Sequence, residues 1–206
     1  MEKINVGIIG AGRIGQVHAK SITYHIPQAK IVAISDIYVE GAKKVAEELG
    51  IPNYYEDYHE ILNNPEINAV LICSSTDTHA DIAVEAAKAG KNIFCEKPVD
   101  LTVAKIKKVI EAVKYSCENG KIVAAICAAP SILGHLGILD GKKATSFPGF
   151  EKELKGADYT GTHTVTDGNI ITAKGAGCAI EFGHAIVSLA VSKDAADKVI
   201  GDMQCL

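Results

Sequence analysis

Short aliphatic runs alternate with amphipathic stretches along the first 120 residues. The runs are rich in Val and Ile and are bounded by Gly, Asn or Asp, which is typical of buried strands. These runs predict strands over residues 4–9, 31–35, 53–55, 68–75 and 92–95. The intervening polar and apolar residues recur at helical spacing and predict helices over residues 13–24, 40–50, 56–64, 76–90 and 101–116. Alternation of strand and helix predicts right-handed crossovers and a parallel sheet.

The pattern changes in the last third of the chain. An apolar run predicts a strand over residues 121–127, followed by a helix over 131–137 and a short strand within 142–147. Two alternating runs, 162–166 and 169–175, flank Asp167-Gly168 and predict a β-hairpin. Residues 177–193 are strongly apolar and predict one long final helix that packs on the sheet.

These elements predict an α/β fold with a three-layer, doubly wound and mostly parallel sheet, a Rossmann/flavodoxin-like hybrid. We expect residues 1–206 to form a single domain with strand order 3-2-1-4-5 for the first five strands. The strand over 121–127 should lie beside the fifth strand, and the strand within 142–147 should lie outside it.

Composition narrows the classes of partner. Hydrophobic residues make up 48% of the 206 residues, aromatic residues only 5%, and Trp is absent, which favours an aliphatic core of the kind found in parallel sheets. The net charge of −4 shows no basic excess, so we expect no nucleic-acid partner. We expect neither a membrane span nor a signal peptide, and therefore a cytoplasmic protein. The sequence leaves its oligomeric state open between a monomer and a weak homodimer.

The six cysteines are scattered rather than paired. They stand at Cys73, Cys95, Cys117, Cys127, Cys178 and Cys205, without a C-x-x-C motif or a nearby pair of histidines. This spacing predicts neither a metal site nor a disulfide framework. Most of these thiols are expected to be small core residues.

A glycine-rich turn follows the first predicted strand. In Gly10-Ala-Gly12-Arg-Ile-Gly15, the first glycine permits a tight turn and the second allows a pyrophosphate to approach the backbone. The third allows close packing of helix on strand. Asp36 stands 21 residues after Gly15, at the end of the second strand, where a carboxylate accepts hydrogen bonds from a ribose diol and repels a 2′-phosphate. The motif predicts NAD binding; the alternative is a structural turn with a helix-capping aspartate.

Residues 1–114 resemble the N-terminal domain of the Gfo/Idh/MocA oxidoreductases, and in particular the inositol 2-dehydrogenases. The segments that carry the resemblance are GIIGAGRIGQVHA, AISD, LICSSTDTH and FCEKP. It implies that Ala11, Arg13 and Ile14 line the pyrophosphate loop and that Ser74, Ser75, Thr76 and His79 line the cofactor cleft. Glu96 and Lys97 would face the nicotinamide ribose, Lys97 would take part in proton transfer, and a cis bond would often precede Pro98. The alternatives are a helix-start role for His79 and a solvated Lys97.

A second motif belongs to thiol chemistry. In KIVAAICAAP, Cys127 ends a predicted strand where the chain must turn sharply into a helix. Such a turn can expose a nucleophile to backbone amides that lower its pKa. The alternative is an inert buried thiol.

Residues 120–206 resemble the C-terminal half of the ThiJ/PfpI superfamily, in its parkinsonism-associated branch. The segments are KIVAAICAAP, GKKATSFPGFEKEL, VTDGNIITAKGAG and IEFGHAIV. The resemblance places Cys127 at the reactive cysteine, with the Ala128 amide as an oxyanion donor. Its acidic partner would come from the other half of that family. Asp158, which aligns with a histidine of some members, and His163 and His184 are expected to be ordinary surface or capping residues.

Each half thus lacks the part that its own family would supply. We interpret the chain as an engineered chimera joined within residues 112–121, with NAD binding retained and no efficient turnover. Three alternatives remain: a ThiJ/PfpI-type thiol hydrolase or glyoxalase at Cys127, a residual inositol-type NAD-dependent dehydrogenase, and a structural chimera that binds nothing. In this interpretation Lys97 and Cys127 are vestigial catalytic candidates.

Overall fold

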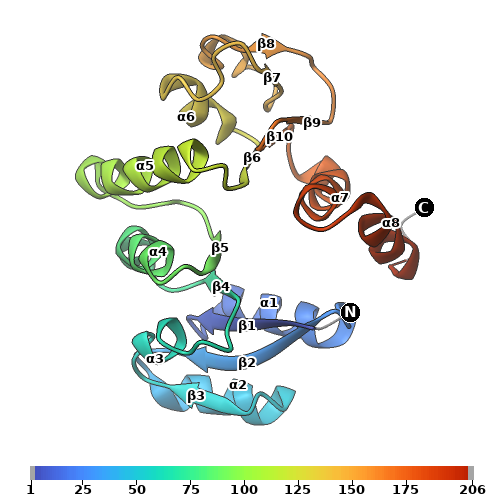
Figure 1. Cartoon of the computed structure of the whole chain (residues 1–206). Helices are drawn as coiled ribbons and strands as arrows, with labels where there is room; N and C mark the ends of the chain where they lie inside the picture. Colours follow the sequence, from blue (N-terminus) through green and yellow to red (C-terminus); the bar gives the residue numbers. More distant parts are fainter. Residues whose placement is uncertain (1–2, 204–206) are drawn as a thin grey trace. The chain divides into compact units, whose positions relative to one another are not determined.

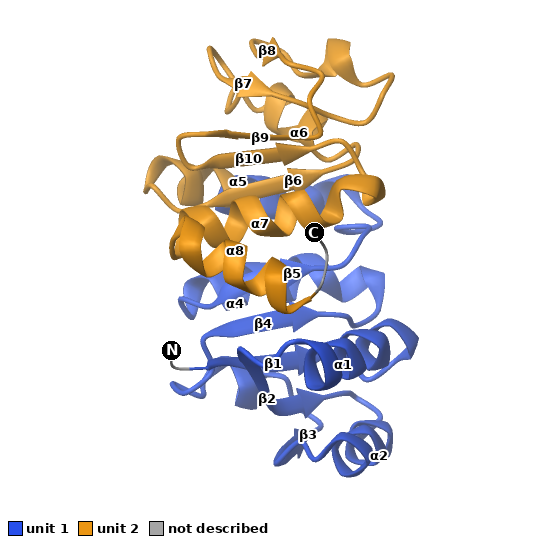
Figure 2. Ribbon diagram, turned by 90° about the vertical axis from the view of Figure 1, so that its right-hand side faces the viewer, with its two compact units in different colours: residues 1–112 blue, residues 113–206 orange. Residues whose placement is uncertain are grey.

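The computed structural model describes residues 3–203, so Cys205 lies outside the described residues. The chain divides into two compact units, residues 1–112 and 113–206, which are coloured separately in Figure 2. Helix α5 (Val103–Glu118) contains the boundary between them.

Unit 1 is a parallel α/β unit (Figure 1). Its strands are β1 (Ile4–Ile9), β2 (Ala29–Ser35), β3 (Asn53–Tyr55), β4 (Ala69–Ile72) and β5 (Asn92–Cys95). Its helices are α1 (Arg13–His25), α2 (Val39–Leu49), α3 (His59–Leu62), the 3-10 turn η1 (Thr76–Thr78) and α4 (His79–Lys88). The strands pair in parallel in the order β3-β2-β1-β4-β5.

Helices cover both faces of this sheet. Apolar residues of β1 and β2 pack on one face against α1 and α2, where Ala19, Ile22 and Val45 are buried. On the other face Ile61 of α3 and Ile82 of α4 pack over β4. The strands are therefore buried on both sides, which explains why they read as continuous apolar runs.

Unit 2 contains two further sheets. Its elements are β6 (Val123–Ile126), α6 (Pro130–His135), β7 (Lys143–Ala144), η2 (Glu151–Glu153), β8 (Asp158–Tyr159), β9 (Thr164–Asp167), β10 (Ile170–Ala173), η3 (Ala176–Cys178), α7 (Ala179–Ala190) and α8 (Lys193–Asp202). One sheet has the order β6-β10-β9 and the other joins β7 to β8. Gly168 turns the β9–β10 hairpin with a φ of 61°, a conformation that favours glycine.

The α/β class, the strand order 3-2-1-4-5 and the Asp-Gly hairpin are confirmed. One strand placement was wrong: the strand beside β6 within unit 2 is β10, and β7 pairs with β8 instead. The expected placement of β6 beside β5 joins the two units and stays a prediction. The predicted final helix was also wrong in extent, because α7 ends at Ala190 and α8 is a separate helix. Ser192 caps α8 by accepting a hydrogen bond from the Ala195 amide at 3.2 Å.

No helix within residues 3–203 is long and apolar enough to cross a membrane. Over the same residues, no three His, Cys, Asp or Glu side chains gather closely enough to hold a metal ion.

Candidate dinucleotide site and thiol elbow

The three glycines of the loop between β1 and α1 are required for different steric reasons. Gly10 has a φ of +107°, and a Cβ there would lie 2.5 Å from the Cys73 carbonyl group. A Cβ on Gly15 would overlap the carbonyl oxygen of Gly10. A Cβ on Gly12 would have no neighbour within 4 Å. The first and third glycines therefore close the turn, whereas the second leaves open space beside the backbone.

The start of α1 supplies hydrogen-bond donors at this open position. Gly12 is the N-cap, and no side chain caps the helix. The first amides of a helix have no intrahelical acceptor, and together with the helix dipole they favour an anion. Arg13 and Ile14 are exposed in this first turn, and Ala11 is buried behind it. This cradle fits the pyrophosphate of a dinucleotide.

Asp36 joins the glycine loop to the end of β2. Its Oδ2 accepts a hydrogen bond from the Ala11 amide at 2.7 Å, and its Oδ1 accepts one from the Tyr38 amide at 2.9 Å. The Gly10 amide donates to the Ser35 carbonyl at 2.7 Å. Since a carboxylate oxygen can accept more than one hydrogen bond, Asp36 retains acceptor capacity toward a ribose diol. Its negative charge disfavours a phosphate at the same position.

The residues after β4 lie at the same carboxyl edge of the sheet. The Ser74 hydroxyl is 2.7 Å from that of Thr78, and the short turn η1 begins at Thr76, after Ser75. His79 is 2% exposed, with its Nδ1 2.8 Å from the Pro98 carbonyl and its Nε2 3.0 Å from the Ser74 carbonyl. The imidazole thus ties the loop after β4 to the loop after β5, as a positioning residue.

The loop after β5 holds Glu96 and Lys97. Glu96 Oε1 lies 2.7 Å from Nε2 of His18, and Glu96 Oε2 accepts a hydrogen bond from the Lys97 amide at 3.2 Å. The His18 ring also contacts Phe94 edge to face, with ring centroids 5.3 Å apart. Lys97 is exposed, and the peptide bond from Lys97 to Pro98 is cis. His18 was missed from the sequence, although it stands in the GQVHA segment, because 78 residues separate it from Glu96.

All thirteen predicted cofactor residues lie in unit 1, at or beyond the carboxyl ends of β1, β2, β4 and β5. In a parallel α/β sheet, ligands bind outside these ends, where the strand order reverses. Here the reversal falls between β1 and β4, beside the glycine loop. Their individual contacts with a cofactor remain predictions.

Cys127 lies in unit 2, at the end of β6. It is exposed and has a φ of 67°, the only described residue other than glycine with a positive φ. Its amide donates to the Ala173 carbonyl at 3.0 Å, and its carbonyl accepts from the Phe147 amide at 2.9 Å, so both sides fix the turn. Ala128 follows it, and α6 begins at Pro130. The backbone has the form of a nucleophile elbow, and the thiol is not the buried alternative.

The three polar residues expected near the surface have local partners. The backbone amide of Asp158, in β8, donates a hydrogen bond to the Lys142 carbonyl, and His163 Nδ1 lies 3.4 Å from Glu181 Oε1. His184 Nε2 lies 2.7 Å from Asp197 Oδ1.

Two family models match the chain. The oxidoreductase family with an NAD-binding Rossmann fold matches residues 4–125. The DJ-1/PfpI family matches residues 98–189. The two matches overlap over residues 98–125, which contain α5 and most of β6, and the two predicted resemblances are thereby confirmed.

Similar proteins agree with the first match. A myo-inositol 2-dehydrogenase from Thermotoga maritima is 41% identical over 111 residues, which are 54% of this chain and 33% of that protein. A scyllo-inositol 2-dehydrogenase (NAD(+)) from Bacillus subtilis is 41% identical over 121 residues, 57% of this chain and 35% of that protein. The chain thus spans about a third of the length of these relatives.

Solved structures agree as well. The apo scyllo-inositol dehydrogenase of Lactobacillus casei superposes with a TM-score of 0.53 at 31% identity, over 55% of this chain and 34% of that one. A myo-inositol dehydrogenase of the same organism, in complex with NAD(H) and myo-inositol, has a TM-score of 0.50 at 26% identity, over 61% of this chain and 44% of that one.

Proposed function

Because the chain belongs to the oxidoreductase family with an NAD-binding Rossmann fold, we propose that it is an engineered chimera that binds NAD without efficient turnover. The observation that carries the proposal is the complete glycine loop with Asp36 in unit 1, in a chain whose residues 98–189 match a different family. The first segment would extend over residues 1–114 and the second over 120–206, joined within α5 or directly after it as parts of one α/β domain.

The residues of the loop have distinct tasks in this proposal. The amides of Arg13 and Ile14 hold the pyrophosphate, Gly12 lets it approach, and Asp36 accepts the hydroxyls of the adenine ribose. Ser74, Ser75 and Thr76 border the cleft, while His79 fixes the loop that carries them. When bound, NAD supplies a hydride acceptor. Lys97 is an exposed amine that can move a proton at the edge where Glu96 is held by His18.

Efficient turnover requires a substrate held in reactive geometry beside the cofactor. In this chain the residues that follow the nucleotide-binding half form the β6-β10-β9 sheet and match the DJ-1/PfpI family. The described second unit therefore does not match the part of the oxidoreductase family that would form an inositol pocket. We expect no NADH absorbance at 340 nm with myo-inositol or scyllo-inositol at saturating NAD.

Thermal unfolding with nucleotide tests the binding proposal. NAD at about a hundred times its Kd adds about 2.7 kcal/mol to the free energy of unfolding, which raises the Tm by several degrees. NADP at equal concentration should shift the Tm less, because Asp36 repels the 2′-phosphate. Asp36→Ala should abolish the NAD shift, and Asp36→Asn, which keeps an acceptor for the Ala11 amide, should weaken the preference for NAD over NADP. Cooperative unfolding without any nucleotide shift would overturn the proposal and leave a structural chimera.

A second function is favoured by the geometry of Cys127. An exposed thiol on a strained strand-to-helix turn is typical of a nucleophile. If the second half retains ThiJ/PfpI chemistry, wild-type protein should consume methylglyoxal, and Cys127→Ser should not. Equal consumption by both proteins would contradict thiol catalysis.

A further inference from the structure

A hydroxyl, an imidazole and a carboxylate follow one another on helices α7 and α8. Ser188 Oγ lies 3.5 Å from His184 Nδ1, and His184 Nε2 lies 2.7 Å from Asp197 Oδ1. Ser188 and His184 stand one turn apart on α7, and Asp197 comes from α8. The other Asp197 oxygen, Oδ2, accepts a hydrogen bond from Lys193 at 2.5 Å. The order of the groups is that of a serine nucleophile, its base and the residue that orients the base.

Asp197 is ionised at neutral pH. The hydrogen bond from Lys193 lowers the pKa of this carboxyl group, and the hydrogen bond to His184 lowers it further. The Asp197 carboxylate can only accept in this contact, so Nε2–H of His184 donates the hydrogen bond and the lone pair of Nδ1 is directed to the hydroxyl side. The Ser188–His184 distance is long for a hydrogen bond, as is common for catalytic pairs without substrate.

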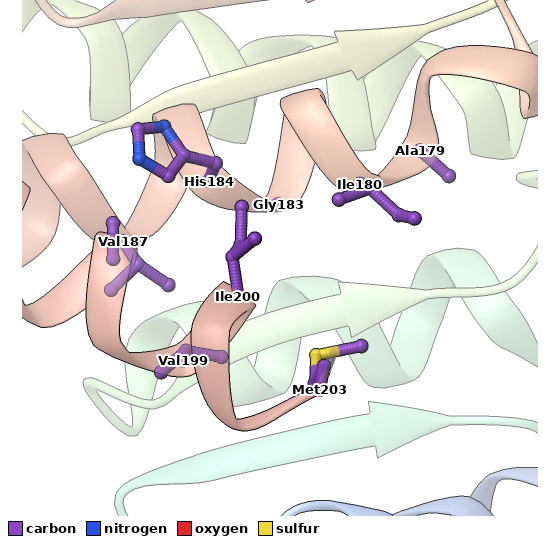
Figure 3. Close-up of a pocket in the computed structure, with 9 residues that line it drawn as sticks. Ala179, Ile180, Gly183, His184, Val187, Val199, Ile200 and Met203 are labelled. Atoms are coloured by element: carbon purple, nitrogen blue, oxygen red, sulfur yellow. The ribbon is translucent and has the colours of Figure 1, made fainter. Parts of the chain in front are cut away.

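His184 borders two hollows of unit 2. One, of about 350 Å³, is lined by Thr166, His184, Ala185, Ser188 and Leu189. The other is an apolar groove of about 330 Å³ between α7 and α8. In Figure 3 His184 and Val187 lie toward one end of this groove and Ala179 and Met203 toward the other, with Ile200 between them. The imidazole thus lies between an open hollow that contains the Ser188 and Thr166 hydroxyls and a groove that accepts an apolar group.

We propose that Ser188, His184 and Asp197 form an acyl-transfer site for carboxylic esters that carry an apolar chain. The ester carbonyl lies in the hollow beside Ser188, and the apolar chain lies in the α7–α8 groove. The Thr166 hydroxyl donates a hydrogen bond to the carbonyl oxygen as negative charge develops on it. Ser188 and His184 are the catalytic residues, and Asp197 is a positioning residue.

The chemistry uses only the ester and water. Ser188 Oγ forms a bond to the carbonyl carbon while its proton passes to His184 Nδ1. The carbon–oxygen bond to the alcohol then breaks, and the imidazolium gives that proton to the departing alcohol. A water molecule attacks the acyl-serine with His184 as base, and the carboxylic acid and the free hydroxyl are released.

Hydrolysis of p-nitrophenyl butyrate by the full chain tests this site. We expect a burst of p-nitrophenol followed by slower turnover, and a fall in kcat/KM of about 100-fold or more in Ser188→Ala and His184→Gln, the scale of general-base catalysis. Asp197→Asn should lower kcat, and Asp197→Glu should recover part of it, which a purely structural role would not give. Thr166→Val should lower kcat with little change in KM. Hydrolysis that persists at the wild-type rate in Ser188→Ala would overturn the proposal.

A covalent readout separates this site from the thiol elbow. A fluorophosphonate probe should label Ser188, identified by peptide mass mapping, in both the wild type and Cys127→Ala. Labelling at another residue, or hydrolysis that disappears in Cys127→Ala, would assign the activity elsewhere and overturn the proposal. NAD binding in unit 1 is measured separately, so the two proposals fail independently.

Gly183 provides a test of the groove that does not depend on the catalytic residues. A Cβ at Gly183 would have no neighbour within 4 Å, so a larger side chain can enter the groove without a clash at its base. In the wild type, kcat/KM should rise about three- to fourfold for each methylene added from acetate to hexanoate. Gly183→Leu should remove that rise, and Gly183→Ala, the matched control, should keep it. An unchanged chain-length preference in Gly183→Leu would overturn the placement of the chain in the groove.

Discussion

Cys73 and Cys127 each follow the carboxyl end of a parallel strand, but the first is buried in unit 1 and the second is exposed in unit 2. Cys73, after β4, is 4% exposed and lies against the glycine loop. Burial raises its pKa to about 12, and the nearby charges of Glu96 and Cys95 act in the same direction. Cys127, after β6, is exposed on a turn with a φ of 67°.

The difference shows whether a turn presents its backbone amides or a side chain to a ligand. In unit 1 the positive φ falls on Gly10, which adopts it readily, and the backbone itself is brought toward a ligand. In unit 2 the positive φ falls on a residue with a side chain, at a cost of about 1–2 kcal/mol, and the side chain is presented instead. One turn therefore suits an anion held by amides, and the other suits a nucleophile.

The largest expected difference is in alkylation. A pKa of about 12 instead of 9.0 lowers the thiolate fraction of Cys73 about a thousandfold at pH 7.5. The greater nucleophilicity of a high-pKa thiolate offsets part of this, so its reaction with iodoacetamide should be about 30-fold slower or more than that of an ordinary thiol. Burial raises the pKa of Cys95 to about 11, so it should also react slowly. Mass mapping over time should show Cys127 modified before Cys73 and Cys95.

The pH dependence gives the control for this result. The rate at Cys73 in the folded protein should keep rising with pH, because its thiolate fraction levels off only above a pKa of about 12. Unfolding in urea should bring its rate up to that of the other thiols. Rapid modification of Cys73 in the folded protein at pH 7.5 would contradict the burial described for unit 1.

Gly15→Ala should cause the largest loss of stability. Alanine normally favours a helix over glycine by up to about 1 kcal/mol, but here its Cβ would overlap the carbonyl of Gly10. Because backbone cannot move aside as a flexible side chain can, we expect a loss of about 1–3 kcal/mol in the free energy of unfolding. Urea unfolding measures it. Gly183→Ala is the matched helical control and should be neutral or stabilising, so equal effects in both variants would contradict this account.

Gly12→Ala should separate binding from stability. Its Cβ meets no neighbour within 4 Å, and its φ of −67° suits any residue, so the Tm without ligand should stay within about 1–2 °C. The methyl group would occupy the space beside the first helical amides, and the Kd for NAD should rise about tenfold or more. Titration by isothermal calorimetry checks this. An unchanged Kd would remove Gly12 from the binding cradle.

The sequence predicts the fold best where burial of a strand on both faces leaves a continuous apolar run in the sequence. The runs that became β1, β2 and β4 are buried on both faces, so their apolar residues identify them without tertiary information. The pairing of β6 with β10 is different, since an apolar run of four residues does not indicate which later strand will pair with it. Strand β8 has two residues and carries no periodicity. The signal for α8 was present in Ser192 and in buried Ala196 and Ile200, but the polar residues between them concealed it.

The predictability of the sites follows the same division. Gly10, Gly15 and Asp36 are recognisable because their tasks depend on residue type and short spacing. His18 was missed and His79 was named only through the family resemblance, because their tasks are contacts with groups distant in the chain: Glu96 for His18 and Pro98 for His79. The strain at Cys127 was expected from the strand-to-helix turn, whereas the hydroxyl–imidazole–carboxylate order on α7 and α8 depends on a helix that the pattern did not reveal.

Cys127→Gly should give the smallest effect and the most direct test of strain at the elbow. Glycine removes the cost of a positive φ, about 1–2 kcal/mol. It also increases the conformational entropy of the unfolded chain, which lowers the free energy of unfolding by about 0.5–1 kcal/mol. The net result should be a gain of about 0.5–1 kcal/mol, or about 1–4 °C in Tm. Cys127→Ala removes the thiol but keeps the strain, so it should change the Tm little. If both variants raised the Tm equally, the gain would come from loss of the thiol, and the turn would hold no strain to release.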